Sequence, residues 1–159
     1  MQKLSTLFLI AITVGLTGTA YAQGGTHLTI HNELGDDHLC MDASLDHGIH
    51  DGDPVYIYRC HGRENQRWTV TQSIHGESAL VGVDGFCLDV SGAEKHDGTP
   101  VQLYQCHFGS NQRFVVQQEG HIKEVGSGKC LASRGNKDRS PVVIEDCHDT
   151  PNQIWLFEK

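Results

Sequence analysis

Short apolar segments alternate with turn-forming residues along most of the chain. Each segment is a few residues long, is bounded by Gly, Asn, Asp or Ser, and is typical of a β-strand rather than a helix. The pattern predicts four strands in each of three successive units. The predicted strands are 28–31, 39–42, 55–60 and 68–71, then 80–83, 86–90, 101–106 and 113–117, then 121–125, 130–133, 142–147 and 154–157.

The three units carry the same landmarks in the same order: a Cys, a Pro-Val step, a second Cys, a Gln and an aromatic residue. These landmarks are Cys40, Pro54, Cys60, Gln66 and Trp68; Cys87, Pro100, Cys106, Gln112 and Phe114; and Cys130, Pro141, Cys147, Gln153 and Trp155. One such unit cannot bury its own apolar face. We therefore expect repeats of about 26–75, 76–118 and 119–159 to pack around a pseudo-threefold axis.

The first 22 residues do not fit this repeat. Lys3 precedes a largely apolar run over 4–16, and Ala20-Tyr21-Ala22 fits a signal-peptidase site. The apolar run is shorter than the roughly 20 residues needed to span a bilayer. The sequence predicts a signal peptide over 1–22, a mature chain from Gln23, no membrane span and a secreted or periplasmic protein.

Composition and charge narrow the function classes. The chain of 159 residues has 12 Lys and Arg against 20 Asp and Glu, a formal charge of −8. Basic side chains scattered singly over an acidic protein argue against nucleic acids and anionic membranes as partners. Residues 23–159 are expected to form one domain, and six Cys in an exported chain predict three disulfides.

The motifs of the second unit resemble those of the ricin B-type lectin domain, which is shared with the thirteenth family of carbohydrate-binding modules. Cys-Leu-Asp at 87–89 is followed by Gly-x-Pro-Val-x-Leu-Tyr-x-Cys-His at 98–107 and by Asn-Gln-x-aromatic at 111–114. The resemblance extends over 26–159. It implies an all-β β-trefoil with Trp68, Phe114 and Trp155 in the central core.

Pairing of the two Cys within each unit gives the disulfides Cys40–Cys60, Cys87–Cys106 and Cys130–Cys147. If the bridged residues lie directly opposite each other in an antiparallel hairpin, the register follows. It places Asp42 opposite Tyr58 and Asp89 opposite Tyr104. The third unit has Ala132 opposite Glu145 and lacks both groups.

A carboxylate beside a phenol ring suits a sugar, because the carboxylate accepts hydrogen bonds from hydroxyl groups and the ring covers the C–H face of a pyranose. By the resemblance, the ligand contacts fall on Asp42, Tyr58, His61 and Asn65 in the first unit, and on Asp89, Gln102, Tyr104, His107 and Asn111 in the second. Tyr56 stands where the second unit has Gln102. The third unit keeps His148 and Asn152, so a turn-stabilising role is an alternative for the asparagines.

The sequence gives little support for a metal site or for catalysis. His31 and His38, or His47 and His50, are spaced like metal ligands, but bridged cysteines leave no thiolate to join them. No metal and no cofactor are expected. Glycoside hydrolysis usually takes two facing carboxylates, and each site offers one, so no enzyme is expected.

The sequence predicts a secreted lectin for galactose-type or related sugars, with glycans or glycoconjugates as partners and two shallow sites of about millimolar affinity. Because histidines border both sites, we expect binding to change between about pH 5 and 7. The alternative is a secreted β-trefoil protein-interaction module, such as a toxin adhesion subunit or a hydrolase inhibitor.

Overall fold

The computed structural model describes residues 26–34, 38–71 and 75–159. The predicted signal peptide lies outside the described residues. The described part contains twelve strands and five short 3₁₀ turns. The strands are β1 (His27–Asn32), β2 (Leu39–Ala43), β3 (Val55–Arg59), β4 (Trp68–Val70), β5 (Leu80–Val81), β6 (Cys87–Val90), β7 (Thr99–Tyr104), β8 (Phe114–Val116), β9 (Ile122–Glu124), β10 (Cys130–Ser133), β11 (Ser140–Glu145) and β12 (Trp155–Glu158). We call β1–β4, β5–β8 and β9–β12 the first, second and third lobes.

All twelve predicted strands are present, and their ends differ for physical reasons. β7 and β11 begin two residues before their predicted starts, because Thr99 pairs with Ile144 and Ser140 pairs with Ile57 of neighbouring lobes. The hydrophobic pattern of a single unit carries no information about contacts between lobes. Cys60, Cys106 and Cys147 lie past the ends of the strands that were expected to contain them.

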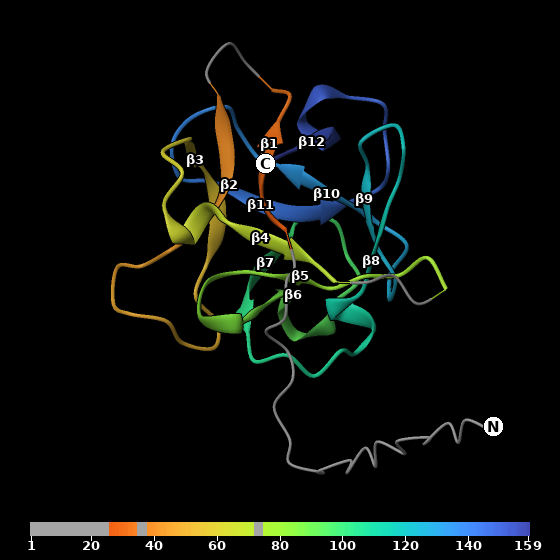
Figure 1. Cartoon of the computed structure of the whole chain (residues 1–159). Coiled ribbons are helices and arrows are strands. Elements are labelled where there is room, and N and C mark those ends of the chain that lie inside the picture. The colour runs from red at the N-terminus through yellow and green to blue at the C-terminus, as the bar shows by residue number, and fades with distance from the viewer. Residues whose placement is uncertain (1–25, 35–37, 72–74) are drawn as a thin grey trace, which may run out of the picture.

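The first and last strands of each lobe form a closed barrel. β1 pairs with β4 and β12, β4 with β5, and β8 with β9. A bridge from Ser78 to Phe114 and a hydrogen bond from the Trp155 N–H to the Gly120 carbonyl complete the ring. Figure 1 shows β1, in orange, beside β12, in dark blue, although they lie far apart in the sequence.

The two middle strands of each lobe form a hairpin, and the three hairpins meet in a cap over the barrel. They are β2–β3, β6–β7 and β10–β11. β11 pairs with both β3 and β7, and a bridge from Pro54 to Gln102 joins the first hairpin to the second. The all-β trefoil predicted from the sequence is therefore confirmed.

The core lies inside the barrel and under the cap. Trp68, Phe114 and Trp155 are 0 %, 0 % and 1 % exposed, as the sequence predicts. The two indole N–H groups donate to the carbonyls of Met41 and Leu131 at 3.0 Å, so neither polar atom is buried without a partner. Gly82 leaves room for Trp68, because a Cβ at that position would lie 2.8 Å from the ring.

The three disulfides pair as predicted, but the hairpin register differs by two residues. Asp42 lies opposite Tyr56 rather than Tyr58, and Asp89 lies opposite Gln102 rather than Tyr104. In the third lobe Ala132 lies opposite Val143 rather than Glu145.

The register prediction was wrong because the disulfides are diagonal. Tyr58 lies opposite Cys40, and Cys60 is two residues further on, with its Cα atom 5.1 Å from that of Cys40. Side chains on a strand alternate between faces, so a shift of two residues keeps the same face. Asp42 and Tyr58 therefore share a face as diagonal neighbours.

In the described residues, no helix has the length and apolar character needed to cross a membrane.

Candidate functional site

Two carboxylates occupy equivalent places on the cap hairpins of the first and second lobes. Asp42 lies on β2 and Asp89 on β6, and each contacts the 3₁₀ turn that follows its hairpin. These turns are η1 (Glu64–Gln66) and η4 (Ser110–Gln112). Only 3 % of either Asp side chain is exposed, so little of each carboxylate is open to solvent.

In the second lobe, the two oxygens of the Asp89 carboxylate have different numbers of protein donors. Its Oδ1 accepts a hydrogen bond from Gln102 Nε2 at 3.1 Å. Its Oδ2 accepts from Asn111 Nδ2 at 2.9 Å and from Gln112 Nε2 at 2.8 Å, and His107 Nε2 lies 3.4 Å away. A carboxylate oxygen has two lone pairs, so Oδ1 can accept a further hydrogen bond from a ligand hydroxyl.

The first lobe repeats most of this arrangement. Asp42 Oδ1 accepts from Asn65 Nδ2 at 2.9 Å, and its Oδ2 accepts from Gln66 Nε2 at 2.8 Å with His61 Nε2 at 3.3 Å. Tyr56 takes the place of Gln102 opposite the carboxylate. The structure thus brings the predicted Asp, His and Asn together in both lobes.

Burial raises the pKa of the Asp42 carboxyl above its usual value. The hydrogen bond from Gln66, the charge of His61 and the hydrogen bond from Asn65 act in the opposite direction. Desolvation disfavours a charged group, and hydrogen bonds to the charged form favour it. The surrounding donors therefore offset part of the desolvation, and the pKa of the Asp42 carboxyl stays above its usual value.

Partly exposed aromatic rings lie near both carboxylates. Tyr104 is 38 % exposed and its ring centroid lies 6.1 Å from that of His107, whose side chain is 47 % exposed. In the first lobe the rings of Tyr58 and His61 are also 6.1 Å apart. The second lobe offers the more open ring surface.

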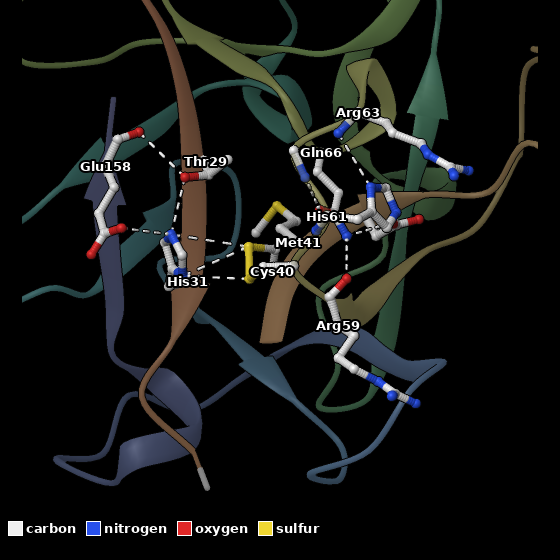
Figure 2. The surroundings of a disulfide bond; sticks show 12 residues. Thr29, His31, Cys40, Met41, Arg59, His61, Arg63, Gln66 and Glu158 are labelled. Atoms are coloured by element: carbon white, nitrogen blue, oxygen red, sulfur yellow. Dashed lines mark hydrogen bonds and ion pairs between the residues drawn. A yellow bond between two sulfur atoms is a disulfide. The ribbon is translucent and has the colours of Figure 1, made fainter. Parts of the chain in front are cut away.

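Both histidines are oriented by the backbone. His107 Nδ1 accepts a hydrogen bond from the Gly109 N–H at 3.0 Å, and His61 Nδ1 accepts one from the Arg63 N–H at 3.2 Å. An Nδ1 that accepts leaves the hydrogen on Nε2 of the neutral ring. Each Nε2 then faces the carboxylate, and Figure 2 shows the hydrogen bond from the Arg63 N–H to the His61 ring.

Sequence reasoning missed Gln66 and Gln112 as parts of these clusters. Their Oε1 atoms accept the backbone N–H groups of His61 and His107 at 2.7 and 2.8 Å, while their Nε2 atoms bind the carboxylates. The signal was present, since a Gln directly follows the Asn in every unit. It was used only to align the repeats.

The third lobe shows which contacts belong to the fold alone. Gln153 accepts the His148 N–H at 2.7 Å, and Asn152 donates to the Ser133 carbonyl at 3.3 Å, although Ala132 stands at the position of the Asp. Asn65 and Asn111 donate to the equivalent carbonyls, both at 3.2 Å. The asparagines therefore stabilise the turn in every lobe and also hold the carboxylate in two of them.

Two surface hollows lie beside the third lobe and are lined by polar side chains that include Glu119, His121 and Asp149. Neither Asp42 nor Asp89 lines them.

Comparison with known proteins identifies related sequences and folds. Residues 76–159 match the ricin-type beta-trefoil lectin domain, and residues 19–104 match the ricin-type beta-trefoil lectin domain-like family. No curated protein sequence matches the chain.

Solved structures share the fold. The designed threefold-symmetric protein ThreeFoil is 25 % identical over 84 % of this chain and 98 % of its own, with a TM-score of 0.77. The agglutinin from Abrus precatorius is 20 % identical over 89 % of this chain and 51 % of its own, with a TM-score of 0.72. The C-half of the earthworm R-type lectin, in complex with GalNAc, is 16 % identical over 83 % of this chain and 97 % of its own, with a TM-score of 0.67.

Proposed function

This chain belongs to the ricin-type β-trefoil lectin family, and we propose that it is a secreted lectin for galactose-type or related sugars. The proposed sites are the carboxylate clusters of the first and second lobes, and the third lobe has none. The family supports carbohydrate binding, and the C-half of the earthworm R-type lectin binds GalNAc. Three disulfides are compatible with an oxidising compartment.

The observation that carries the proposal is the second-lobe cluster. Asp89 supplies a charged acceptor, and Gln102 and His107 hold it in one orientation. Tyr104 presents an open ring on the same face. A sugar hydroxyl bonded to Oδ1 would let the C–H face of the pyranose lie on the Tyr104 ring.

The proposed activity is binding rather than catalysis. Each cluster holds a single carboxylate, whereas hydrolysis of a glycosidic bond usually uses a pair. A shallow site of this kind is expected to bind a monosaccharide with a Kd of about 1 mM, or about −4 kcal/mol. Two such sites on one rigid body raise the apparent affinity for dense glycans.

A glycan array followed by titration with methyl galactoside tests the proposal. Tyr104→Ala and Tyr58→Ala remove exposed or half-buried rings without emptying the core, so each variant is expected to keep its fold and lose binding at its own lobe. Glu145→Ala, at the matching position of the third lobe, is the control and should bind like the wild type.

If the wild type bound no glycan on the array, the lectin proposal would be overturned. Unchanged galactoside binding after both Tyr substitutions together would overturn the site assignment. Turnover of a chromogenic glycoside would contradict the non-enzymatic role.

A further inference from the structure

The three disulfides have different neighbours on the barrel strands. Cys40 pairs with His31 of β1, Cys87 with Val81 of β5, and Cys130 with Lys123 of β9. Of these three barrel positions, that of the first lobe alone carries an imidazole.

Nε2 of His31 lies 4.0 Å from Cys40 Sγ, and Nδ1 lies nearer to both sulfurs of this disulfide. The distances are 3.7 Å to Cys40 Sγ and 3.5 Å to Cys60 Sγ, and Figure 2 shows the ring facing the bridge. Cys40 is fully buried and the His31 side chain is 13 % exposed. In the part of the chain that the structure describes, these three residues are the one group whose ligand atoms gather closely enough for a metal ion.

The other ring nitrogen has the partners of a metal-binding histidine. His31 Nε2 lies 3.0 Å from Thr29 Oγ1 and 3.2 Å from Glu158 Oε2. An ionised carboxylate only accepts, so it places the hydrogen on Nε2 and leaves the Nδ1 lone pair free to bind a metal once the ring has turned toward the sulfurs. Histidines that bind metals usually donate their second nitrogen to a carboxylate in this way.

The distances also match a tetrahedral zinc ion. Zn–S bonds of about 2.3 Å and Zn–N bonds of about 2.0 Å place the nitrogen about 3.5 Å from each sulfur and the two sulfurs about 3.8 Å apart. The nitrogen of His31 already has the first spacing. Cys60 lies past the end of β3, so rotation of its side chain can separate the sulfurs without breaking strand pairing.

We propose that Cys40, Cys60 and His31 form a zinc site when their disulfide is reduced. A thiol or phosphine reductant supplies two electrons and two protons, which break the Sγ–Sγ bond and leave two thiols. Zn²⁺ replaces both thiol protons, which pass to solvent, and accepts the Nδ1 lone pair. Water or His38, whose ring lies 6.3 Å from that of His31, completes the coordination.

The site would restore a crosslink that reduction removes. The disulfide ties β2 to the end of β3, directly before His61 of the proposed sugar site. In a reducing environment the metal would join the same two residues, so the first lobe would keep its geometry. The oxidised protein has no thiolates here and would not bind zinc through them.

Cysteine alkylation in the phosphine-reduced full chain, with and without zinc chloride, tests the proposal. Zinc is expected to slow alkylation of Cys40 and Cys60 by at least about tenfold. The other four cysteines serve as internal controls. Cobalt chloride should give thiolate-to-metal charge-transfer bands and the d–d bands of a tetrahedral ion.

Two variants identify the histidine. His31→Val copies the residue that lies opposite Cys87 in the second lobe and should abolish the selective protection. Glu158→Gln, at an exposed side chain, should retain the fold and weaken zinc binding, because it removes only the partner of Nε2. Equal protection of all six cysteines, or protection that survives His31→Val in a folded protein, would overturn the proposal.

Discussion

Gln112 combines two tasks at one buried position. Its carbonyl oxygen accepts the N–H groups of His107 and Phe108, and its amide nitrogen donates to Asp89 and to the Gln105 carbonyl. Gln153 makes two equivalent backbone contacts in the third lobe, to the His148 N–H and the Asp146 carbonyl, without a carboxylate. Comparison of Gln112 with Gln153 therefore separates the role of the Gln in the turn from its role in the proposed site.

Alanine substitution of these two glutamines should separate the two effects. Each loss leaves buried backbone groups without partners, which costs about 1–3 kcal/mol of unfolding free energy per group. Gln112→Ala should also lose sugar binding in the second lobe, whereas Gln153→Ala should only lower stability. Urea unfolding and galactoside titration measure the two effects, and equal loss of binding in both variants would contradict the assignment.

Phe108 holds an uncommon backbone conformation for a bulky residue. Its φ is 56° and its side chain is partly exposed, while the equivalent residue of the first lobe is Gly62 with φ 69°. A side chain at such an angle stores strain that glycine lacks.

Phe108→Gly should therefore raise stability by about 0.5–1 kcal/mol. The measurement is the midpoint of urea unfolding, compared with Phe108→Ala, which keeps a Cβ and should gain less. A lower midpoint for the glycine variant would show that contacts of the ring outweigh the strain.

The strand pattern within one lobe predicted the features that depend on residues close in the sequence. It missed the features that depend on contacts with other lobes. The strands and the disulfides follow from alternation and repetition, and the burial of Trp68 follows from the resemblance to the ricin B-type lectin domain. The starts of β7 and β11 depend on pairing between lobes, and the hairpin register depends on a diagonal disulfide that spacing alone does not distinguish from a direct one. The Gln partners of Asp42 and Asp89 come from a turn more than 20 residues away, so their part in the buried network needed the structure.

Each hairpin is also fastened to its neighbour by a carboxylate. Asp138 accepts the Arg59 N–H at 2.9 Å, Asp97 accepts the Asp146 N–H at 3.0 Å and Asp51 accepts the Gln105 N–H at 2.7 Å. The backbone and side chain of Arg59 lower the pKa of Asp138, and Lys129, followed by the Asp146 N–H, lowers the pKa of Asp97. These contacts link lobes at exposed positions.

The pH dependence of unfolding should report these contacts. A carboxyl whose pKa is lower in the folded state adds stability above its unfolded pKa of about 3.8 and loses it as pH falls through the folded value. We expect the unfolding free energy to decline below about pH 4 and to decline less in Asp138→Asn. Glu119→Gln, at another exposed position, is the control, and identical profiles for Asp138→Asn and the wild type would contradict the expectation.

At the scale of the molecule, the three lobes share one scaffold and differ in a few side chains. The third lobe retains His148, Asn152 and Gln153 in the places that surround the carboxylate elsewhere. Ala132 and Val143 stand where the second lobe has Asp89 and Gln102, and Glu145 stands where it has Tyr104.

The triple substitution Ala132→Asp, Val143→Gln and Glu145→Tyr should therefore create a third sugar site. It removes the pair of Arg134 and Glu145, which is worth little because it lies at the surface. Calorimetric titration with galactoside should show the stoichiometry rise from two to three. An unchanged stoichiometry in a folded variant would show that more than these side chains distinguishes the lobes.

The pairing of β1 with β12 has a consequence for biosynthesis. Among the strands, β1 leaves the ribosome first and β12 last. β1 therefore lacks this pairing partner until the other strands have been translated. Closure of the barrel is then a late event, and the edge of β1 that β12 will cover stays open to unwanted pairing during synthesis. A circular permutant that begins at β5 would place a different pair of strands at the two ends of the chain. Its yield of folded protein should change, while the contacts of the folded state stay the same.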